Sequence, residues 1–323
     1  MSIEQYIAYL MSEPRSSSCV KASEVLGVSH DKINRLLNNS IFRGQDLFEK
    51  VRDRLDLDGG TLTVDDTVLD KPYTNVEKNP LAGYYWSGKH HKSVKGINLI
   101  ALVYTDSKGL CMPVNFRVYT PSEGKSKNHY FEEMFYEVLR WGLRPGRVSA
   151  DSWYSSLKNL KFLRQEEIGF LVGLKSNRTI STQPGAYQQV EQADIPEEGL
   201  FTHLKAFGFI KVFRTVAQDG DARHYAMWEP DQNRTQAIST EEFKQAKKEH
   251  WEVEKLFRLI KQNCQAEKFW VRNPVAVENH LFCVLRAAQR LRAMAYDQII
   301  NSAYAVQRTI FLEAQRRFIA QFA

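Results

Sequence analysis

Four acidic residues stand at positions where carboxylates could do chemistry. Asp65 and Asp66 interrupt the segment TLTVDDTVLD, Asp151 ends the segment GRVSAD, and Glu254 lies within KKEHWEVEKLFRLIKQ. Carboxylates are hard oxygen ligands of the kind Mg²⁺ prefers, and two Mg²⁺ ions about 4 Å apart can activate one oxygen and stabilise another in phosphodiester transfer. A lone strand-end aspartate is more often a turn or capping residue. The prediction of a metal site therefore depends on the combination.

Glu254 lies on a predicted helix that has one polar stripe and one apolar side. At 100° per residue, four cationic or titratable side chains fall within about 40° of Glu254. These are Lys247, His250, Arg258 and Lys261. A separate arc, formed by Val253, Leu256, Phe257 and Ile260, would face a core. The stripe is either a solvated face with a Glu254–Arg258 pair or a phosphate-binding row beside a metal ligand, and the strand aspartates favour the second interpretation.

Composition narrows the classes of function. The 323 residues include 44 Lys and Arg against 38 Asp and Glu, a net charge of +6 that leans towards a polyanionic partner. The four cysteines have no CxxC spacing, and no G-x-x-x-x-G-K-[ST] loop is present. No segment reaches the roughly 20 apolar residues of a membrane span. We expect a cytoplasmic, nucleoid-associated protein with no membrane partner.

The first 58 residues predict a helical region with helix-turn-helix spacing. Val20, Val25 and Leu26 would face inward on one helix, and Ser29 would cap a second helix after a tight turn at Gly27. The second helix would bury Ile33, Leu36 and Leu37 and would expose Ser29, His30, Lys32, Asn34 and Arg35. DNA contact through Lys32 and Arg35, or a plain helical hairpin, both fit this pattern.

From residue 59 the apolar period changes from helical to strand-like. Strands are predicted at 59–70, 97–106, 109–120, 146–151 and 170–175, with helices at 128–143 and 155–169. This order, β-β-β-α-β-α-β, is that of a ribonuclease H-like domain, an α/β fold whose mixed sheet is flanked by helices. We expect residues 59–177 to be the first part of such a catalytic domain. Residues 178–238 would form a β-rich insertion, and 239–323 would hold the Glu254 helix and C-terminal helices.

These motifs together resemble the DDE transposases of bacterial insertion sequences, in particular the group with a β-strand insertion before the glutamate. VDDT resembles the D-x-T pattern of that family through Asp65 and Thr67, with Asp66 as the alternative, and VSADSWYSS resembles A-D-S-x-Y at Asp151. When the Y-x2-R-x3-E-x6-K signature is registered on Glu254, Lys261 matches its lysine. His250 and Lys247 stand where the family has arginine and tyrosine.

The resemblance implies that Asp65, Asp151 and Glu254 hold two Mg²⁺ ions, for which Mn²⁺ can substitute. It further implies cleavage of double-stranded DNA and strand transfer at terminal inverted repeats, by a homodimer in a synaptic complex. Eight residues are candidate DNA contacts: Lys247, His250, Arg258, Lys261, Lys89, Lys92, Lys32 and Arg35.

Three alternatives stay open. Trp153 and Tyr154 could stack on a flipped base, although packing under the sheet is the more common role of such aromatics. A ribonuclease H-like nuclease or resolvase would use the same carboxylates without strand joining. A domesticated DNA-binding protein would keep the helix-turn-helix without catalysis.

Overall fold

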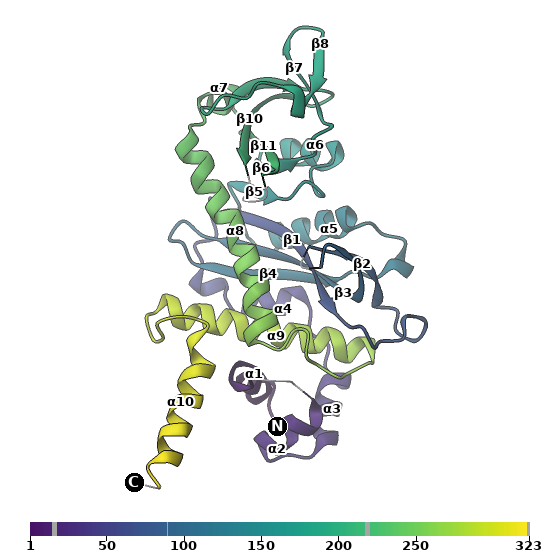
Figure 1. Ribbon diagram of the computed structural model, residues 1–323, viewed down its shortest axis with the longest axis vertical. Helices are drawn as coiled ribbons and strands as arrows, with labels where there is room; N and C mark the ends of the chain where they lie inside the picture. The colour runs from purple at the N-terminus through teal and green to yellow at the C-terminus, as the bar shows by residue number, and fades with distance from the viewer. Residues whose placement is uncertain (15–17, 89, 217–219, 322–323) are drawn as a thin grey trace.

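The computed structural model describes residues 1–14, 18–88, 90–216 and 220–321 (Figure 1). Lys89, one of the candidate DNA contacts, lies outside the described residues. Among the described helices, none is long and apolar enough to cross a membrane.

Helices form both ends of the chain and cover the central sheet. The α-helices are α1 (Ile3–Ser12), α2 (Cys19–Leu26), α3 (His30–Asn39), α4 (Gly44–Glu49), α5 (Lys127–Arg140), α6 (Leu157–Gln165), α7 (Gln232–Ala237), α8 (Thr240–Asn263), α9 (Pro274–Tyr296) and α10 (Ala305–Ile319). Short 3-10 helices are η1 (Arg52–Arg54), η2 (Val76–Lys78), η3 (Pro121–Glu123) and η4 (Val190–Gln192). The predicted helices at 128–143 and 155–169 are confirmed as α5 and α6.

A single mixed sheet runs through the middle of the molecule. Its strands are β1 (Thr61–Asp70), β2 (Ala82–Ser87), β3 (Lys92–Thr105), β4 (Cys111–Val118), β5 (Arg147–Ala150), β6 (Gly169–Leu174), β7 (Thr179–Gln183), β8 (Ala186–Gln189), β9 (Leu200–Leu204), β10 (Gly208–Val216) and β11 (Ala222–Trp228). The strand order is β2-β3-β1-β5-β6-β11-β10-β9-β7-β8, with β4 paired to β3. The five strands predicted between 59 and 175 are confirmed as β1, β3, β4, β5 and β6.

One strand, β2, was not predicted from the sequence. In its sequence, AGYYWS, apolar and polar residues do not alternate, because aromatic residues stand on both faces of the strand. Tyr84 and Trp86, on one face, are exposed. As a consequence, Asp151 follows the fifth strand along the chain and not the fourth.

The predicted β-rich segment after residue 178 continues the main sheet. Its last strand, β11, pairs antiparallel with β6, whereas β1, β5 and β6 pair in parallel. Figure 1 shows these added strands stacked beyond β6, at the end of the molecule opposite the N-terminal helices. The division of the chain at residues 58, 177 and 238 stays a prediction.

Alternation along β1 separates the two faces of the sheet. Leu62 and Val64 belong to a core that also contains side chains of α5 and α6. Leu69 belongs to a second core shared with α8, α9 and the N-terminal helices. Because successive strand residues point to opposite faces, Asp65 lies on the α8 side with Leu69, and Asp66 lies on the α5 side.

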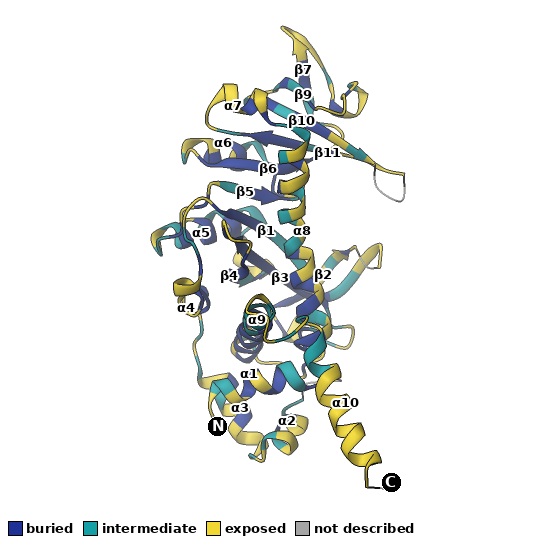
Figure 2. Cartoon of the chain, turned by 90° about the vertical axis from the view of Figure 1, so that its left-hand side faces the viewer, coloured by how far each residue is buried: buried dark blue, intermediate teal, exposed yellow. Residues whose placement is uncertain are grey.

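Helix α8 crosses the sheet from the added strands to the far end of β1 (Figure 2). Near its start, Phe243 stacks on Phe213 of β10, with ring centroids 4.4 Å apart. Near its end, Lys261 Nζ donates a hydrogen bond to the Val68 carbonyl of β1, at 2.7 Å. The predicted core-facing arc of this helix, Val253, Leu256, Phe257 and Ile260, is buried.

The N-terminal helices pack on α9 near the other end of the chain. The Asn279 side chain of α9 donates hydrogen bonds to the carbonyls of Leu37 and Ser40, both at 2.7 Å. Tyr6 of α1 lies 3.0 Å from the His280 ring of the same helix. These buried contacts join residues far apart in sequence.

The predicted inward positions on α2 are partly wrong. Val20 and Val25 are exposed, whereas Ala22 is fully buried. The contact stripe of this short helix follows Cys19, Ala22 and Leu26, which recur at i, i+3 and i+7. Both valines fall outside that stripe.

Candidate catalytic site and DNA-contact residues

Two of the predicted carboxylates lie side by side on adjacent parallel strands. The β1–β5 ladder ends at the pair Val64 and Ala150, so Asp65 and Asp151 each follow it directly. Asp65 Oδ1 accepts a hydrogen bond from the backbone N–H of Asp66 at 2.7 Å. Asp151 Oδ1 accepts one from the backbone N–H of Trp153 at 2.8 Å. Local backbone contacts thus orient both carboxylates.

Contacts on either side of Glu254 place it over the same two strands. One turn earlier, His250 Nδ1 lies 2.9 Å from Ser149 Oγ on β5. About two turns later, Lys261 is fixed to β1 through the Val68 carbonyl. Because Glu254 lies between these two contacts on the helix, its exposed side chain is held beside the ends of β1 and β5.

The pKa of Asp65 reflects both its burial and the acidic groups around it. The pKa of Asp65 is raised well above its ordinary value, first by burial and then by the charges of Asp151, Asp66 and Glu254. Burial also raises the pKa of Asp151, against the hydrogen bonds it accepts and the nearby Lys127 charge. Crowded, partly buried carboxylates repel one another, and a cation between them would relieve this repulsion.

Asp66 has a different environment from Asp65. Its Oδ2 accepts hydrogen bonds from Lys127 Nζ and Asn98 Nδ2, both at 2.6 Å, and its Oδ1 accepts one from Tyr154 Oη at 3.1 Å. Both of its oxygens therefore have protein donors. This arrangement favours Asp65 over Asp66 as the metal-facing residue of the pair.

The donor set of the site fits a hard divalent cation. Asp65, Asp151 and Glu254 offer carboxylate oxygens, and none of the three forms an ion pair with Lys or Arg in the described part of the chain. The side chains are not already closed around a metal position, since no group of three or more His, Cys, Asp or Glu among the described residues has metal-holding geometry.

A family model described as "Transposase DDE domain" matches residues 49–289, a span that contains all three carboxylates. The chain belongs to the DDE transposase domain family. The match covers the sheet, α8 and most of α9.

A solved structure shares this fold. The chain is similar to the one described as a cryo-EM structure of the piggyBac transposase synaptic complex with hairpin DNA (SNHP). The TM-score is 0.56 and the sequence identity 14%, over 99% of this chain and 71% of that chain. The mixed sheet flanked by helices is thus a transposase fold, consistent with the predicted ribonuclease H-like class. A comparison with curated proteins gives no match.

Within this DDE domain, the polar stripe of α8 is engaged mostly by protein. Lys247 Nζ donates to Thr215 Oγ1 at 3.2 Å and lies 5.0 Å from the centre of the Tyr225 ring. Lys261 also forms an ion pair with Glu267, at 3.2 Å. Burial and the nearby Lys247 lower the pKa of His250 to about 4, so His250 is neutral near pH 7. Of the four stripe residues, Arg258 alone is exposed.

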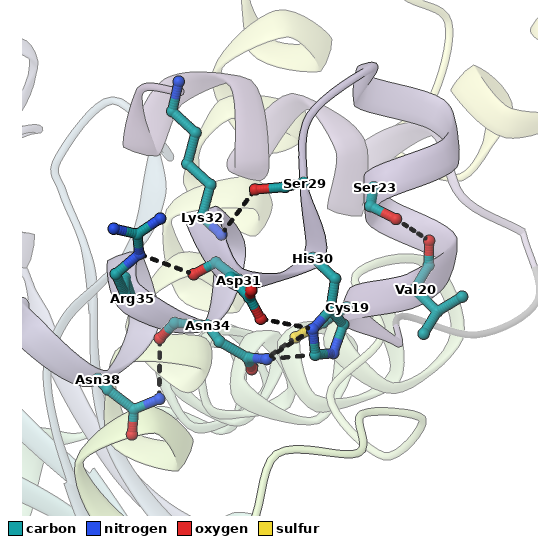
Figure 3. Close-up of polar contacts among 10 residues, drawn as sticks. All are labelled: Cys19, Val20, Ser23, Ser29, His30, Asp31, Lys32, Asn34, Arg35 and Asn38. Carbon is teal, nitrogen blue, oxygen red and sulfur yellow. Dashed lines mark hydrogen bonds and ion pairs between the residues drawn. The ribbon is translucent and has the colours of Figure 1, made fainter.

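The predicted caps of the helix-turn-helix region are present. Gly27 ends α2 with φ of 63°, a left-handed conformation that glycine adopts without strain. The Ser29 hydroxyl accepts from the Lys32 backbone N–H at 3.3 Å. Figure 3 shows Lys32 and Arg35 along α3, where both are exposed. Arg35 Nε donates to the Asp31 carbonyl at 3.4 Å.

The two aromatic residues after Asp151 differ in environment. Tyr154 is 1% exposed and packs against Phe131, which confirms the packing interpretation for this residue. Trp153 is exposed, and Lys127 and Lys175 lie 5.4 and 5.6 Å from the centre of its ring.

Two residues at the site were not recognised in the sequence. Lys127, which the sequence places just before a predicted helix, begins α5 and forms the ion pair with Asp66. Ser149 was not singled out as a site residue. Strand alternation nevertheless places it two residues before Asp151, facing the same side of the sheet. That alternation could have linked Ser149 to the helix carrying His250.

Proposed function

We propose that this chain is a transposase that cleaves DNA and transfers strands at the terminal inverted repeats of a bacterial insertion sequence. The observation that carries the proposal is that Asp65, Asp151 and Glu254 lie on one face of the sheet, where burial and then the acidic neighbours raise the pKa of Asp65. The family match to a transposase DDE domain supports the same reaction.

Asp65, Asp151 and Glu254 would hold two Mg²⁺ ions, with Mn²⁺ as a substitute. When bound, these ions supply activation of the attacking oxygen and stabilisation of the leaving oxygen. The chain's own contribution is to hold the carboxylates: β1 and β5 fix the two aspartates, and the contacts of His250 and Lys261 fix α8 with Glu254. Arg258, which is exposed, would contact a phosphate of the bound DNA.

The remaining DNA contacts are assigned by position. Lys32 and Arg35 on α3 would bind the inverted repeat, and the exposed Lys92 at the start of β3 would bind a phosphate nearer the site. Lys247, His250 and Lys261 would act mainly by holding α8. Two chains would pair two ends in a synaptic homodimer.

Strand joining separates a transposase from a nuclease that uses the same carboxylates. The substrate is duplex DNA carrying the inverted repeats that flank the gene, incubated with the full chain, Mg²⁺ and a circular target. We expect cleaved ends that become covalently joined to the target. Cleavage without any joined product would support a nuclease or resolvase, and binding without cleavage would support an inactive DNA-binding protein.

A further inference from the structure

The start of β3 and its partner β2 form a two-stranded ribbon beyond the rest of the sheet. Pairing of β1 with β3 ends at Asp70 and Gly96, and pairing of β4 with β3 extends only to Leu99. Among the described strands, residues 84–87 and 92–95 therefore pair only with each other. The ribbon, defined by these two ranges, extends past the carboxyl end of β1 at the edge of the sheet (Figure 1).

One face of the ribbon is packed and the other presents aromatic rings. On the packed face, the Tyr85 ring meets the Tyr119 ring edge-on, at 5.9 Å between centroids. On the other face, Tyr84 and Trp86 are 68% and 66% exposed. Lys95 lies directly opposite Tyr84 in the ladder, so a cation and two rings share this face.

The aromatic face lies on the same side of the sheet as the catalytic carboxylates. Ala82, two residues before Tyr84, pairs with Ile97, which belongs to the core beneath α8. Asp65 pairs with Ala101, which belongs to the same core. From Ala101 to Lys95 the path along β3 is about 20 Å at 3.4 Å per residue. Duplex DNA of that length contains about six base pairs.

The charge of the ribbon favours a polyanion over a protein partner. Residues 82–97 contain three lysines and two histidines and no acidic residue. The nearest carboxylate of β1, Asp70, lies 2.8 Å from His90 Nε2, so the connection at the ribbon's end is anchored. A two-stranded ribbon that carries exposed rings and lysines at its surface matches the shape and charge of a duplex groove and its phosphates.

A neighbouring cavity extends this surface. It has a volume of about 470 Å³, and its lining includes the exposed rings of Tyr73 and Trp270 together with Lys78, Lys268 and Arg272. The two carboxylates in the lining, Asp70 and Glu267, are paired with His90 and Lys261. The backbone N–H of Lys71, also in the lining, bonds the Lys95 carbonyl at 3.0 Å. The aromatic and cationic character thus continues from the ribbon to the segment after α8.

We infer that the ribbon binds duplex DNA within about six base pairs of the phosphodiester that reacts. Tyr84 and Trp86 pack against sugars and base edges, and Lys95 on the same face neutralises a phosphate. The exposed Lys92, opposite Ser87 at the end of the ribbon, neutralises a second phosphate. This inference rests on the proposed function, because it takes the carboxylates as the place of reaction. It assigns the ribbon to the DNA beside the cut, and not to recognition by the N-terminal helices.

Binding by the full chain tests the inference with side chains outside the core, three of them exposed and one, Lys95, half-buried, whose removal should not disturb the fold. The variants are Tyr84→Ala with Trp86→Ala, and Lys92→Ala with Lys95→Ala. Matched controls are Tyr296→Ala and Lys161→Ala, an exposed aromatic and an exposed lysine on other elements. Each protein is titrated with an inverted-repeat duplex that includes its flank, at several salt concentrations.

We expect the aromatic pair to weaken binding by about tenfold or more. The lysine pair should reduce the salt slope by about two, one for each lost phosphate contact. A photo-crosslinker at position 86 should label bases within about six base pairs of the cut. Wild-type affinity and salt slope in both ribbon variants, together with no labelling of bases near the cut, would overturn the inference. A difference in sedimentation between the ribbon variants and wild type without DNA would also overturn it, because it would indicate that the ribbon binds a protein partner.

Cleavage of the same duplex keeps the two hypotheses apart. Labelling through the ribbon without any cleavage by the wild-type chain would contradict the proposed function and leave the ribbon as a DNA surface. Cleavage by wild type, together with ribbon variants that bind and cleave like wild type, would contradict the ribbon alone.

Discussion

At the scale of single residues, the two adjacent aspartates of β1 have different environments. Asp66 is saturated by Lys127, Asn98 and Tyr154, whereas Asp65 has acidic neighbours and a raised pKa. The D-x-T pattern favoured Asp65 over its neighbour, and strand alternation showed that the two face opposite ways. The choice between faces depends on which one α8 covers, and no local sequence feature contains that information.

The raised Asp65 pKa predicts that the metal-free protein loses stability as the pH rises. The folded state keeps a proton that the unfolded chain releases near the ordinary pKa of 3.8. The free energy of unfolding should therefore fall from about pH 4 upward, by about 1.4 kcal/mol for each pH unit, until the pH passes the raised pKa of the folded state. Asp65→Asn should remove this component of the pH dependence.

Chemical denaturation at a series of pH values, in chelator, measures the difference between the two proteins. We expect the difference in free energy of unfolding between wild type and Asp65→Asn to widen as the pH rises, and to shrink when Mg²⁺ is added to wild type. Parallel stability curves for wild type and Asp65→Asn would show that Asp65 is not held at an elevated pKa.

Asp66→Asn should affect stability more than metal binding. Asparagine keeps a side-chain oxygen that can accept from Tyr154, but it leaves the partly buried Lys127 without its ion pair. We expect a loss of about 1–3 kcal/mol in the free energy of unfolding. Glu133→Gln, which breaks the more exposed pair with Lys125, is the control and should cost under about 1 kcal/mol. Calorimetric Mn²⁺ titration should give near-wild-type affinity for Asp66→Asn and much weaker affinity for Asp65→Asn; the reverse order would reassign the ligand.

At the scale of elements, α8 joins three parts of the sheet and carries Glu254 between two fixed points. Its apolar arc was predicted from period alone, because helical spacing is a local property. The partners of its polar stripe were not predictable, since Thr215, Ser149 and the Val68 carbonyl are far away in sequence. The strand β2 was missed for a related reason: a ribbon outside the core needs no apolar alternation.

Lys261→Met should loosen the end of α8 over β1. The change removes the hydrogen bond to the Val68 carbonyl and the ion pair with Glu267. We expect a loss of about 1–3 kcal/mol in the free energy of unfolding and slower DNA cleavage, because Glu254 is less well positioned. Lys255→Met, on the same helix and in an exposed pair with Glu252, is the control. Normal stability and cleavage in Lys261→Met would show that this contact does not position the helix.

At the scale of the whole molecule, the N-terminal helices pack on α9, and the strands after residue 178 extend the central sheet. The element order indicated a ribonuclease H-like sheet, and the β-rich character of the segment after residue 178 was visible in its turn residues. That this segment would continue the main sheet through β11 and β6 was not visible, because strand pairing across long sequence separations leaves no local pattern. The docking of the N-terminal helices on α9 is another such contact.

Synapsis predicts the composition of the DNA complex. The proposed strand transfer requires two ends to be brought together first, so the proposal predicts that the protein binds paired inverted-repeat ends as two chains with two duplexes. Light scattering coupled to size exclusion, with differently labelled duplexes, measures this stoichiometry. A stable, cleavage-competent complex of one chain with one duplex would contradict the homodimer.

The central claim, that Asp65, Asp151 and Glu254 form one metal-dependent site, is tested most directly by Mg²⁺-dependent cleavage of inverted-repeat DNA. Wild type is compared with Asp151→Asn and Glu254→Gln, with DNA binding measured in parallel. We expect both variants to bind DNA like wild type and to cleave it about a thousandfold more slowly or not at all, since each loses several kcal/mol of transition-state stabilisation. Cleavage at the wild-type rate by both variants would contradict the assignment of the site.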